Sequence, residues 1–140
     1  MATKEDLIRG LNEDLAAELG TVIRYTYQAG KSVGFLGMEL RELFAEEIPD
    51  ELGHAAFLTD VIVDMGGEPT TTPKTFEKPA TIKEMLELDM QMELKDVDAY
   101  MTHAALADEL GEVELKLKLE EMAADEAGHA RELRRILKGL

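Results

Sequence analysis

Apolar residues recur every three or four positions through most of the chain, which is the spacing of one face of an α-helix. The positions that show this best are Leu7, Leu11, Leu15 and Val22 near the start, and Leu115, Leu119, Met122, Leu133 and Ile136 near the end. Strict alternation of apolar and polar residues, typical of a half-buried β-strand, is absent. The pattern therefore predicts an all-α protein.

Turn and capping residues divide the pattern into four predicted helices. Glycines interrupt it between residues 30 and 37, at Gly66 and Gly67, and at Gly111, and glycine commonly follows a helix end. Thr81 and Glu84 form a capping box, and Thr3 with Asp6 forms a weaker one. The predicted helices cover residues 3–32, 38–65, 82–109 and 112–138. Pro49 lies inside the second, where we expect a kink or a locally widened turn rather than a helix end.

Helices of about 27 residues would be about 40 Å long, which suits an antiparallel four-helix bundle. Three of the four prolines fall between residues 66 and 81, so this segment is expected to be a loop. Extended, it could reach about 50 Å and cross the length of a bundle. We predict one domain over residues 1–140, built from hairpins 3–65 and 82–138 and a long crossover at 66–81.

The net charge of the chain limits the kinds of partner that it can bind. The chain has 15 Lys and Arg against 30 Asp and Glu, a formal net charge of -15. Such a surface repels phosphate backbones and anionic lipids and attracts cations, so we expect no nucleic-acid partner and no membrane partner. With no cysteine, disulfides, iron–sulfur clusters and thiolate zinc sites are excluded. No signal-peptide core or membrane-length apolar run is found, so a cytoplasmic location is expected.

The two hairpins repeat one another at an offset of 75 residues, and the repeat includes polar positions. Residues 50–55 and 125–130 share the pattern Asp-Glu-x-Gly-His-Ala. The other matched polar pairs are Asp14 with Asp89, Glu18 with Glu93, and Tyr25 with Tyr100. Each half is therefore interpreted as one helical hairpin that carries the same polar side chains.

The repeated glutamates are expected to point inward at the same height. Glu18 and Glu51 are 33 residues apart, centred on the glycine-rich turn, and Glu93 and Glu126 are also 33 apart, centred beside Gly111. Positions equidistant from a hairpin turn lie level on the two helices. Glu18 and Glu93 also fall on the apolar stripes of their own helices.

Each half also contains Glu-x-x-His, which places two potential metal ligands on one helix face. A single copy is often a surface pair, but here two copies share one context and each lies opposite an inward glutamate. Four carboxylates in an apolar interior would repel one another, and two divalent cations would neutralise them. Oxygen-rich ligation with one imidazole per metal suits iron or manganese better than zinc or copper. The predicted ligands are Glu18, Glu51, His54, Glu93, Glu126 and His129.

This order of ligands along four helices resembles the ferritin-like di-iron carboxylate proteins. Within that class the sequence is most similar to bacterioferritin, which shares the Leu-Asn-x-x-Leu of the first helix, here Leu11, Asn12 and Leu15. The resemblance implies two iron ions per chain, with manganese as an alternative. It also implies that Glu51 and Glu126 bridge the two ions, while the terminal ligands are Glu18, His54, Glu93 and His129.

Two departures from bacterioferritin change what is expected. Bacterioferritin binds haem through a Met between the Glu and His of the second helix, and Leu52 stands at that position, so no haem is predicted. Bacterioferritin also continues into a fifth helix that helps to close its large cage, whereas this sequence ends at Leu140. We therefore expect a homo-oligomer that is a dimer or a small cage.

Four aspartates are candidates for orienting the ligands. Asp14 and Asp89 precede the inward glutamates by one turn, where a carboxylate could accept the other N–H of a ligand histidine. Asp50 and Asp125, each next to a bridging glutamate, are the alternatives. Asp50 could instead mark a route for metal ions.

The remaining polar and aromatic positions are interpreted more simply. Tyr25 and Tyr100 are interpreted as core aromatics, and a redox role stays open as the alternative. His103, whose partner in the repeat is Gln28, is interpreted as structural or as a surface residue. Acidic runs such as Glu46–Glu47 are interpreted as solvated faces.

The resemblance implies a ferroxidase that oxidises Fe(II) with O2 or H2O2 for iron storage or detoxification. A peroxidase, a di-manganese catalase or an oxygenase of the rubrerythrin-like type could use the same ligands. The non-enzymatic alternative is a helical scaffold in which the six residues form a buried salt-bridge network.

Overall fold

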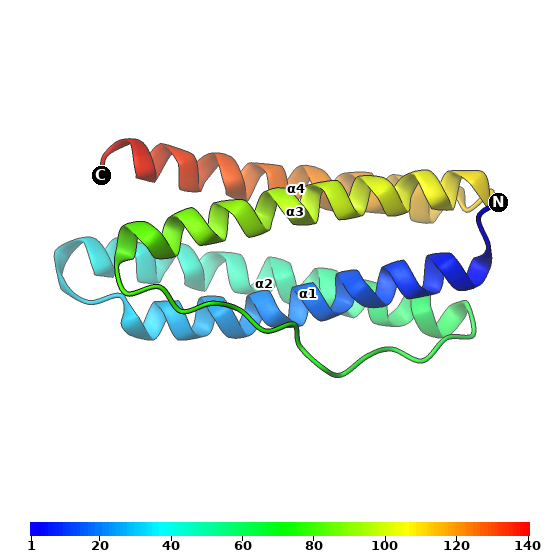
Figure 1. The fold of residues 1–140 in the computed structure, drawn as a ribbon, viewed down its shortest axis with the longest axis horizontal. Coiled ribbons are helices and arrows are strands. Elements are labelled where there is room, and N and C mark those ends of the chain that lie inside the picture. Colours follow the sequence, from blue (N-terminus) through cyan, green and yellow to red (C-terminus); the bar gives the residue numbers. More distant parts are fainter. The chain divides into compact units, whose positions relative to one another are not determined.

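The computed structural model describes all 140 residues and contains four α-helices and no β-strand, which confirms the predicted all-α class (Figure 1). The helices are α1 (Lys4–Lys31), α2 (Gly34–Asp64), α3 (Ile82–Glu109) and α4 (Val113–Lys138). The chain forms two compact units, one of residues 1–14 and 79–140 and one of residues 15–78. No helix combines the length and the apolar character needed to cross a bilayer.

In the unit of residues 15–78, α1 and α2 form an antiparallel hairpin (Figure 1). Leu15 of the stripe predicted for α1 is buried in this unit, as are Leu40 and Leu58 of α2, and each of the three is at most 1% exposed. Tyr25 of α1 stacks on Phe44 of α2, with ring centroids 5.1 Å apart and 25° between the ring planes. Burial of these side chains is what holds the hairpin together.

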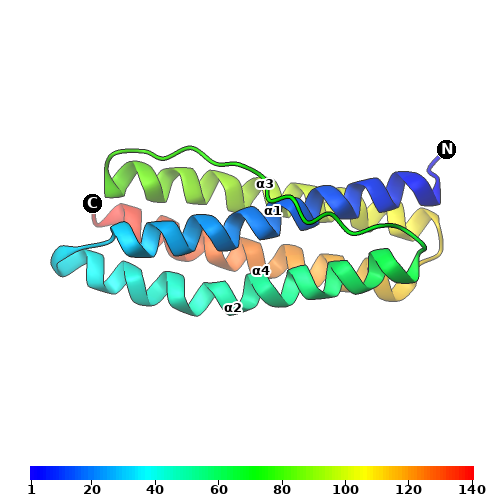
Figure 2. The ribbon, with the colours of Figure 1, turned by 90° about the horizontal axis from the view of Figure 1, so that it is seen from below.

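Figure 2 shows the first part of the crossover between α2 and α3 running beside α1. The Lys74 backbone N–H donates to the carbonyl oxygen of Ala16 at 2.9 Å. Further along, Phe76 lies 6.0 Å from the ring of Tyr27, and the Lys78 ammonium lies 5.3 Å from the centre of the same ring. A segment without regular structure is thus fixed to the helix that carries Glu18.

In the other unit, α3 and α4 run antiparallel and in contact, and the first residues of α1 belong to the same unit (Figure 1). Leu7 and Leu11 of α1, Leu86 of α3, and Leu119 and Leu133 of α4 are all 0% exposed. The stripe at the N-terminus therefore packs with the second hairpin of the sequence.

Most helix ends lie where local signals placed them. Thr81 caps α3 by accepting the N–H of Glu84, and Thr3 and Asp6 exchange two backbone-to-side-chain hydrogen bonds at the start of α1. α2 continues through Pro49, so this proline does not end the helix, as predicted.

The start of α2 was predicted wrongly, because it begins at Gly34 and not near residue 38. Gly34 has a φ of +80° and reverses the chain at once, so the turn is short. Gly37 lies inside the helix rather than in the turn. A Cβ at position 37 would lie 2.6 Å from the backbone carbonyl carbon of Ser32. Gly37 therefore allows close packing and does not mark a helix end.

Candidate metal centre

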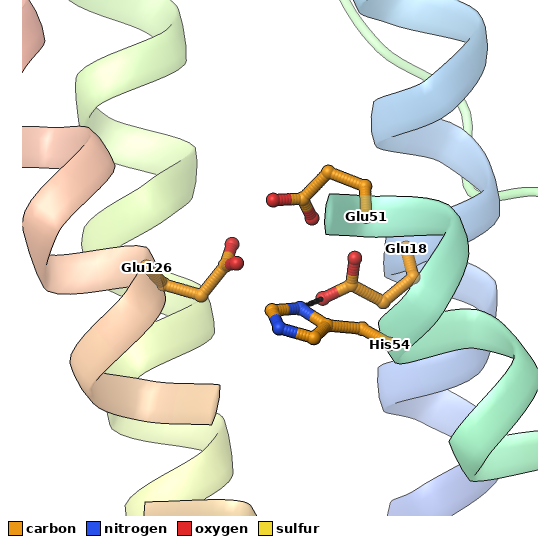
Figure 3. Close-up of side chains that lie close together, drawn as sticks. All are labelled: Glu18, Glu51, His54 and Glu126. Atoms are coloured by element: carbon orange, nitrogen blue, oxygen red, sulfur yellow. Dashed lines mark ion pairs between the residues drawn. The ribbon is translucent and has the colours of Figure 1, made fainter. Parts of the chain in front are cut away.

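Glu18, Glu51 and His54 come together on one side of the α1–α2 hairpin. One ligand atom from each lies within 4.8 Å of the others, and all three residues are buried. The Nδ1 of His54 is 3.5 Å from a carboxylate oxygen of Glu18. Figure 3 shows the three side chains pointing the same way from their helices, and it also draws Glu126 of α4. The equal spacing from the turn thus brings residues 33 positions apart to one height, as predicted.

Glu93, Glu126 and His129 form the matching group in the α3–α4 hairpin. One ligand atom from each again lies within 4.8 Å of the others. The Nδ1 of His129 is 3.8 Å from Glu93 and 3.7 Å from Glu126. Both glutamates are 0% exposed, and the histidine side chain is 12% exposed. The internal repeat of the sequence is therefore also a repeat of side-chain arrangement.

Both groups have the donors and the spacing that a divalent metal ion requires. Their Nδ1-to-oxygen separations, 3.5–3.8 Å, are long for hydrogen bonds. Two atoms that bind one ion at roughly 2.1 Å each can be up to about 4.2 Å apart, so these separations leave room for an ion. Two ionised carboxylates balance one dication, and two carboxylates with one imidazole suit iron or manganese. The residues present therefore fit the metal that the sequence pattern predicts.

The two tyrosines and three of the four candidate aspartates differ in how deeply they are buried. Tyr25, Tyr100 and Asp89 are at most 1% exposed, whereas Asp50 and Asp125 lie at exposed positions. Tyr25 packs in the core of its hairpin, as its stacking on Phe44 shows. The structure thus separates buried Asp89 from the two exposed alternatives for orienting a ligand histidine.

Asp14, the fourth aspartate, was expected to orient a ligand histidine. Instead, its Oδ2 contacts His103, which is not a predicted ligand. His103 Nδ1 lies 2.6 Å from this oxygen, and both side chains are buried. Burial raises the pKa of Asp14, although the hydrogen bond and charge of His103 oppose that rise. Burial would lower the pKa of His103, but the hydrogen bond and charge of Asp14 outweigh it, so this pKa is raised.

Two buried charged residues, Arg24 and Glu47, were not predicted from the sequence. Arg24 is 0% exposed, and its guanidinium carbon lies 5.0 Å from the centre of the Tyr25 ring. Glu47 is 5% exposed, whereas Glu46 beside it is exposed, so only one residue of this acidic pair is solvated. The repeat contained a signal for Glu47, because its partner at an offset of 75 is the apolar Met122.

Comparison with known proteins relates this chain to the ferritin-like proteins. A family model described as a ferritin-like domain matches residues 8–140. A bacterioferritin of Brucella melitensis biotype 1 is 30% identical over 132 residues, which covers 92% of this chain and 81% of that protein.

Solved structures agree with the family match. A ferritin-like, diiron-carboxylate protein from Bacillus anthracis is 40% identical, with a TM-score of 0.94 over 98% of this chain and 99% of the other. Desulfovibrio desulfuricans bacterioferritin is 25% identical, with a TM-score of 0.82 over 96% of this chain and 80% of the other, and its structure is described as showing a diiron site in different catalytic states. The fold is therefore the predicted ferritin-like one.

Proposed function

Because the chain belongs to the ferritin-like family, we propose that it is a non-haem di-iron ferroxidase that oxidises Fe(II) with O2 or H2O2. The observation that carries the proposal is the pair of matching groups, each with two buried glutamates and one histidine within 4.8 Å. A scaffold protein would have no reason to build the same buried donor set twice. Storage or detoxification of iron would be the purpose of such an oxidation.

The two groups are proposed to form one centre for two iron ions. In it Glu51 and Glu126 would bridge the ions. The terminal ligands would be Glu18 and His54 on one ion and Glu93 and His129 on the other. Four ionised glutamates would then balance two ferrous ions, so that a buried site that is costly without metal becomes neutral with it. Manganese is the alternative occupant.

Two ferrous ions held side by side can supply two electrons to one molecule of oxidant. The protein's contribution is to hold the substrate ions and to adapt to their change of charge. Carboxylates can bind through one or two oxygens, so the four glutamates can follow that change without moving the helices. The imidazoles of His54 and His129 turn Nδ1 towards the carboxylates, which fixes the ring nitrogen that would bind metal. The acidic surface raises the local Fe(II) concentration.

Iron oxidation by the metal-free protein tests the proposal directly. Fe(II) is added anaerobically, then O2 or H2O2 is admitted, and oxidation is followed by absorbance together with oxidant consumption. We expect about two ferrous ions to be oxidised rapidly per chain, followed by further turnovers with mineral formation. If no iron binds, or if oxidation is no faster than in buffer, the proposal is wrong.

Variants at buried and exposed glutamates of one helix give the matched control. Glu51→Gln removes a bridging carboxylate and should slow the rapid phase by at least about a hundredfold, since even outer partners of a metal ligand matter by ten- to a hundredfold. Glu46→Gln, at an exposed position of α2, removes the same charge and should leave the rate near that of the wild type. Equal rates in both variants would contradict the assignment of Glu51.

The outcome also decides between storage and the other di-iron or di-manganese activities. If oxidation stops at about two irons per chain without mineral, storage is wrong, and a peroxidase, catalase or oxygenase role is favoured. Peroxide consumption with Mn(II) in place of Fe(II) then separates the catalase. The oligomer that we expect is measured in the same preparation by light scattering.

A further inference from the structure

Asp14 of α1 and His103 of α3 form a buried contact outside the predicted metal ligands. The Nδ1 of His103 lies 2.6 Å from Oδ2 of Asp14, and the two side chains are 11% and 3% exposed. A nitrogen–oxygen separation this short is typical of a hydrogen bond between charged partners. The two residues are 89 positions apart in the chain, so this bond joins the start of α1 to the second hairpin.

The contact departs from the internal repeat. Asp14 corresponds to Asp89, but His103 corresponds to Gln28. A glutamine amide is neutral at every ordinary pH, whereas an imidazole gains or loses its charge near neutrality. Only one half of the repeat therefore carries a group that can titrate at this position.

Gly10 allows the imidazole to reach Asp14. A Cβ at Gly10 would lie 2.6 Å from both Cδ2 and Nε2 of the His103 ring, which no packed side chain tolerates. The ring therefore rests on the bare backbone of α1, one turn before Asp14. Three residues together build the contact: Gly10 leaves room for the ring, the Asp14 carboxylate accepts a hydrogen bond, and the His103 imidazole donates it.

We propose that Asp14 and His103 form a proton-dependent clamp that fastens the first segment of α1, residues 4–14, to α3. A protonated imidazole gives a charged hydrogen bond to the carboxylate. When the imidazole loses its proton, a buried carboxylate faces a neutral ring and the attraction falls. Glu18 follows Asp14 by one turn on the same helix, so the clamp acts on a helix that carries a proposed iron ligand.

The charges around the imidazole determine the direction of the pH effect. Burial works to lower the pKa of His103, and Asp14 and Glu13, both on α1, raise it above 6.5 overall, while α3 and α4 supply none of the charges that shift it. The contribution of the clamp is therefore complete below pH 6.5 and is lost as the pH rises through the folded-state pKa. The pKa of Asp14 is also raised, so on acidification this carboxylate takes up a proton earlier than a free aspartate would, and the charged hydrogen bond is lost there as well. The clamp is therefore strongest between the two folded-state pKa values.

NMR titration of the full, metal-free chain tests the clamp without any iron chemistry, so its result is independent of the proposed ferroxidase activity. The His103 ring signals should titrate with a midpoint above 6.5. In Asp14→Asn the raising charge is gone while burial remains, so the midpoint should fall below 6.5. A wild-type midpoint at or below 6.5, or one unchanged in Asp14→Asn, overturns the proposal.

Hydrogen exchange gives a second readout that needs no aspartate variant. Protection factors of the amides in residues 4–14, corrected for the intrinsic effect of pH, should fall in the wild type as the pH passes the His103 midpoint. His103→Gln copies the residue of the other half of the repeat and can donate to Asp14 at any pH, so its protection should not depend on pH. The same pH dependence in both proteins would show that the histidine is not the switch.

Discussion

Gly20 of α1 lies directly under the backbone of Lys74, so closely that a Cβ at Gly20 would be 2.5 Å from the Lys74 carbonyl oxygen. Ala16, whose carbonyl oxygen accepts the Lys74 N–H, is one turn earlier on the same face of α1. At 100° per residue, Glu18 lies about 200° round the helix from Ala16. The crossover therefore supports α1 from the side opposite to the glutamate.

Gly20→Ala should destabilise the protein, because the new methyl group meets backbone that cannot turn away. Overpacking of this kind costs about 1–3 kcal/mol, which exceeds the gain of roughly 1 kcal/mol that alanine offers over glycine inside a helix. We expect a lower midpoint in urea unfolding followed by circular dichroism.

Gly53→Ala is the control for this substitution. Gly53 lies inside α2, and nothing would come within 4 Å of a Cβ there. The helix should therefore gain about 0.5–1 kcal/mol. If Gly20→Ala stabilised the protein as Gly53→Ala is expected to do, the close passage of the crossover over α1 would be wrong.

Glu126→Gln should make the metal-free protein more stable and remove its response to metal. The variant lacks one of the buried negative charges that repel one another in the proposed centre, a change worth on the order of 1 kcal/mol or more. Wild-type protein at a hundred times the dissociation constant of Mn(II) should gain about 2.7 kcal/mol per site, which the variant loses. Thermal unfolding with and without Mn(II) measures both effects.

Glu132→Gln provides the comparison on the same helix. Glu132 lies at an exposed position of α4, so removing its charge should change the metal-free stability little and leave the stabilisation by Mn(II) intact. Two results would favour the alternative that the six residues form a metal-free polar network. One is a wild-type stability that does not change with Mn(II), and the other is the same behaviour in both variants.

Local signals were enough to predict the hairpins and the level of the glutamates. α3 was predicted at its observed bounds because a cap at Thr81 and a glycine with positive φ at Gly111 mark both sides of it. The grouping of Glu18 with Glu51 followed from counting residues to a turn. The number of residues between a side chain and the hairpin turn can be counted along the chain, so the sequence alone predicts which residues of one hairpin lie level.

Pairings between distant segments could not be predicted in the same way. Nothing local connects Asp14 with His103, and the repeat argued against a mate for the histidine, because its counterpart is Gln28. Gly37 was placed in a turn because glycine usually signals one, whereas its actual role is contact with Ser32. In both cases a tertiary contact decides what the residue does.

Asp6→Ala should loosen the first turn of α1 at neutral pH. The pKa of this exposed carboxyl is lowered, first by the backbone N–H of Thr3 and then by the Thr3 hydroxyl and Arg9. A lowered pKa means that its support is complete above pH 3.8 and is lost as the pH falls through the folded-state value. Hydrogen exchange of the first α1 amides should therefore be faster in Asp6→Ala than in the wild type at pH 7.

Glu5→Ala is the matched variant, since it removes a neighbouring acid that is also in the first turn. Its exchange at pH 7 should stay closer to the wild type, because the helix dipole is weakened but the reciprocal bonds between Thr3 and Asp6 remain. Below the pKa of Asp6 the difference between the two variants should disappear. A difference that persists in acid would mean that the ionised carboxylate is not what caps the helix.

The effect of Gly10→Ala on stability should have opposite signs with histidine and with alanine at position 103. With histidine present, the new Cβ would lie 2.6 Å from the ring, and the ring can retreat only by giving up its 2.6 Å bond to Asp14. The loss should exceed the helix-propensity gain of roughly 1 kcal/mol. In the His103→Ala background there is no ring to meet, so the same Gly10→Ala change should stabilise the protein by about that gain. Urea unfolding of the wild type, the two single variants and the double variant gives the coupling energy between positions 10 and 103. This coupling energy should be larger where the imidazole is charged, because the hydrogen bond that Gly10→Ala breaks is then stronger. Additive effects of the two changes would show that Gly10 and His103 do not touch.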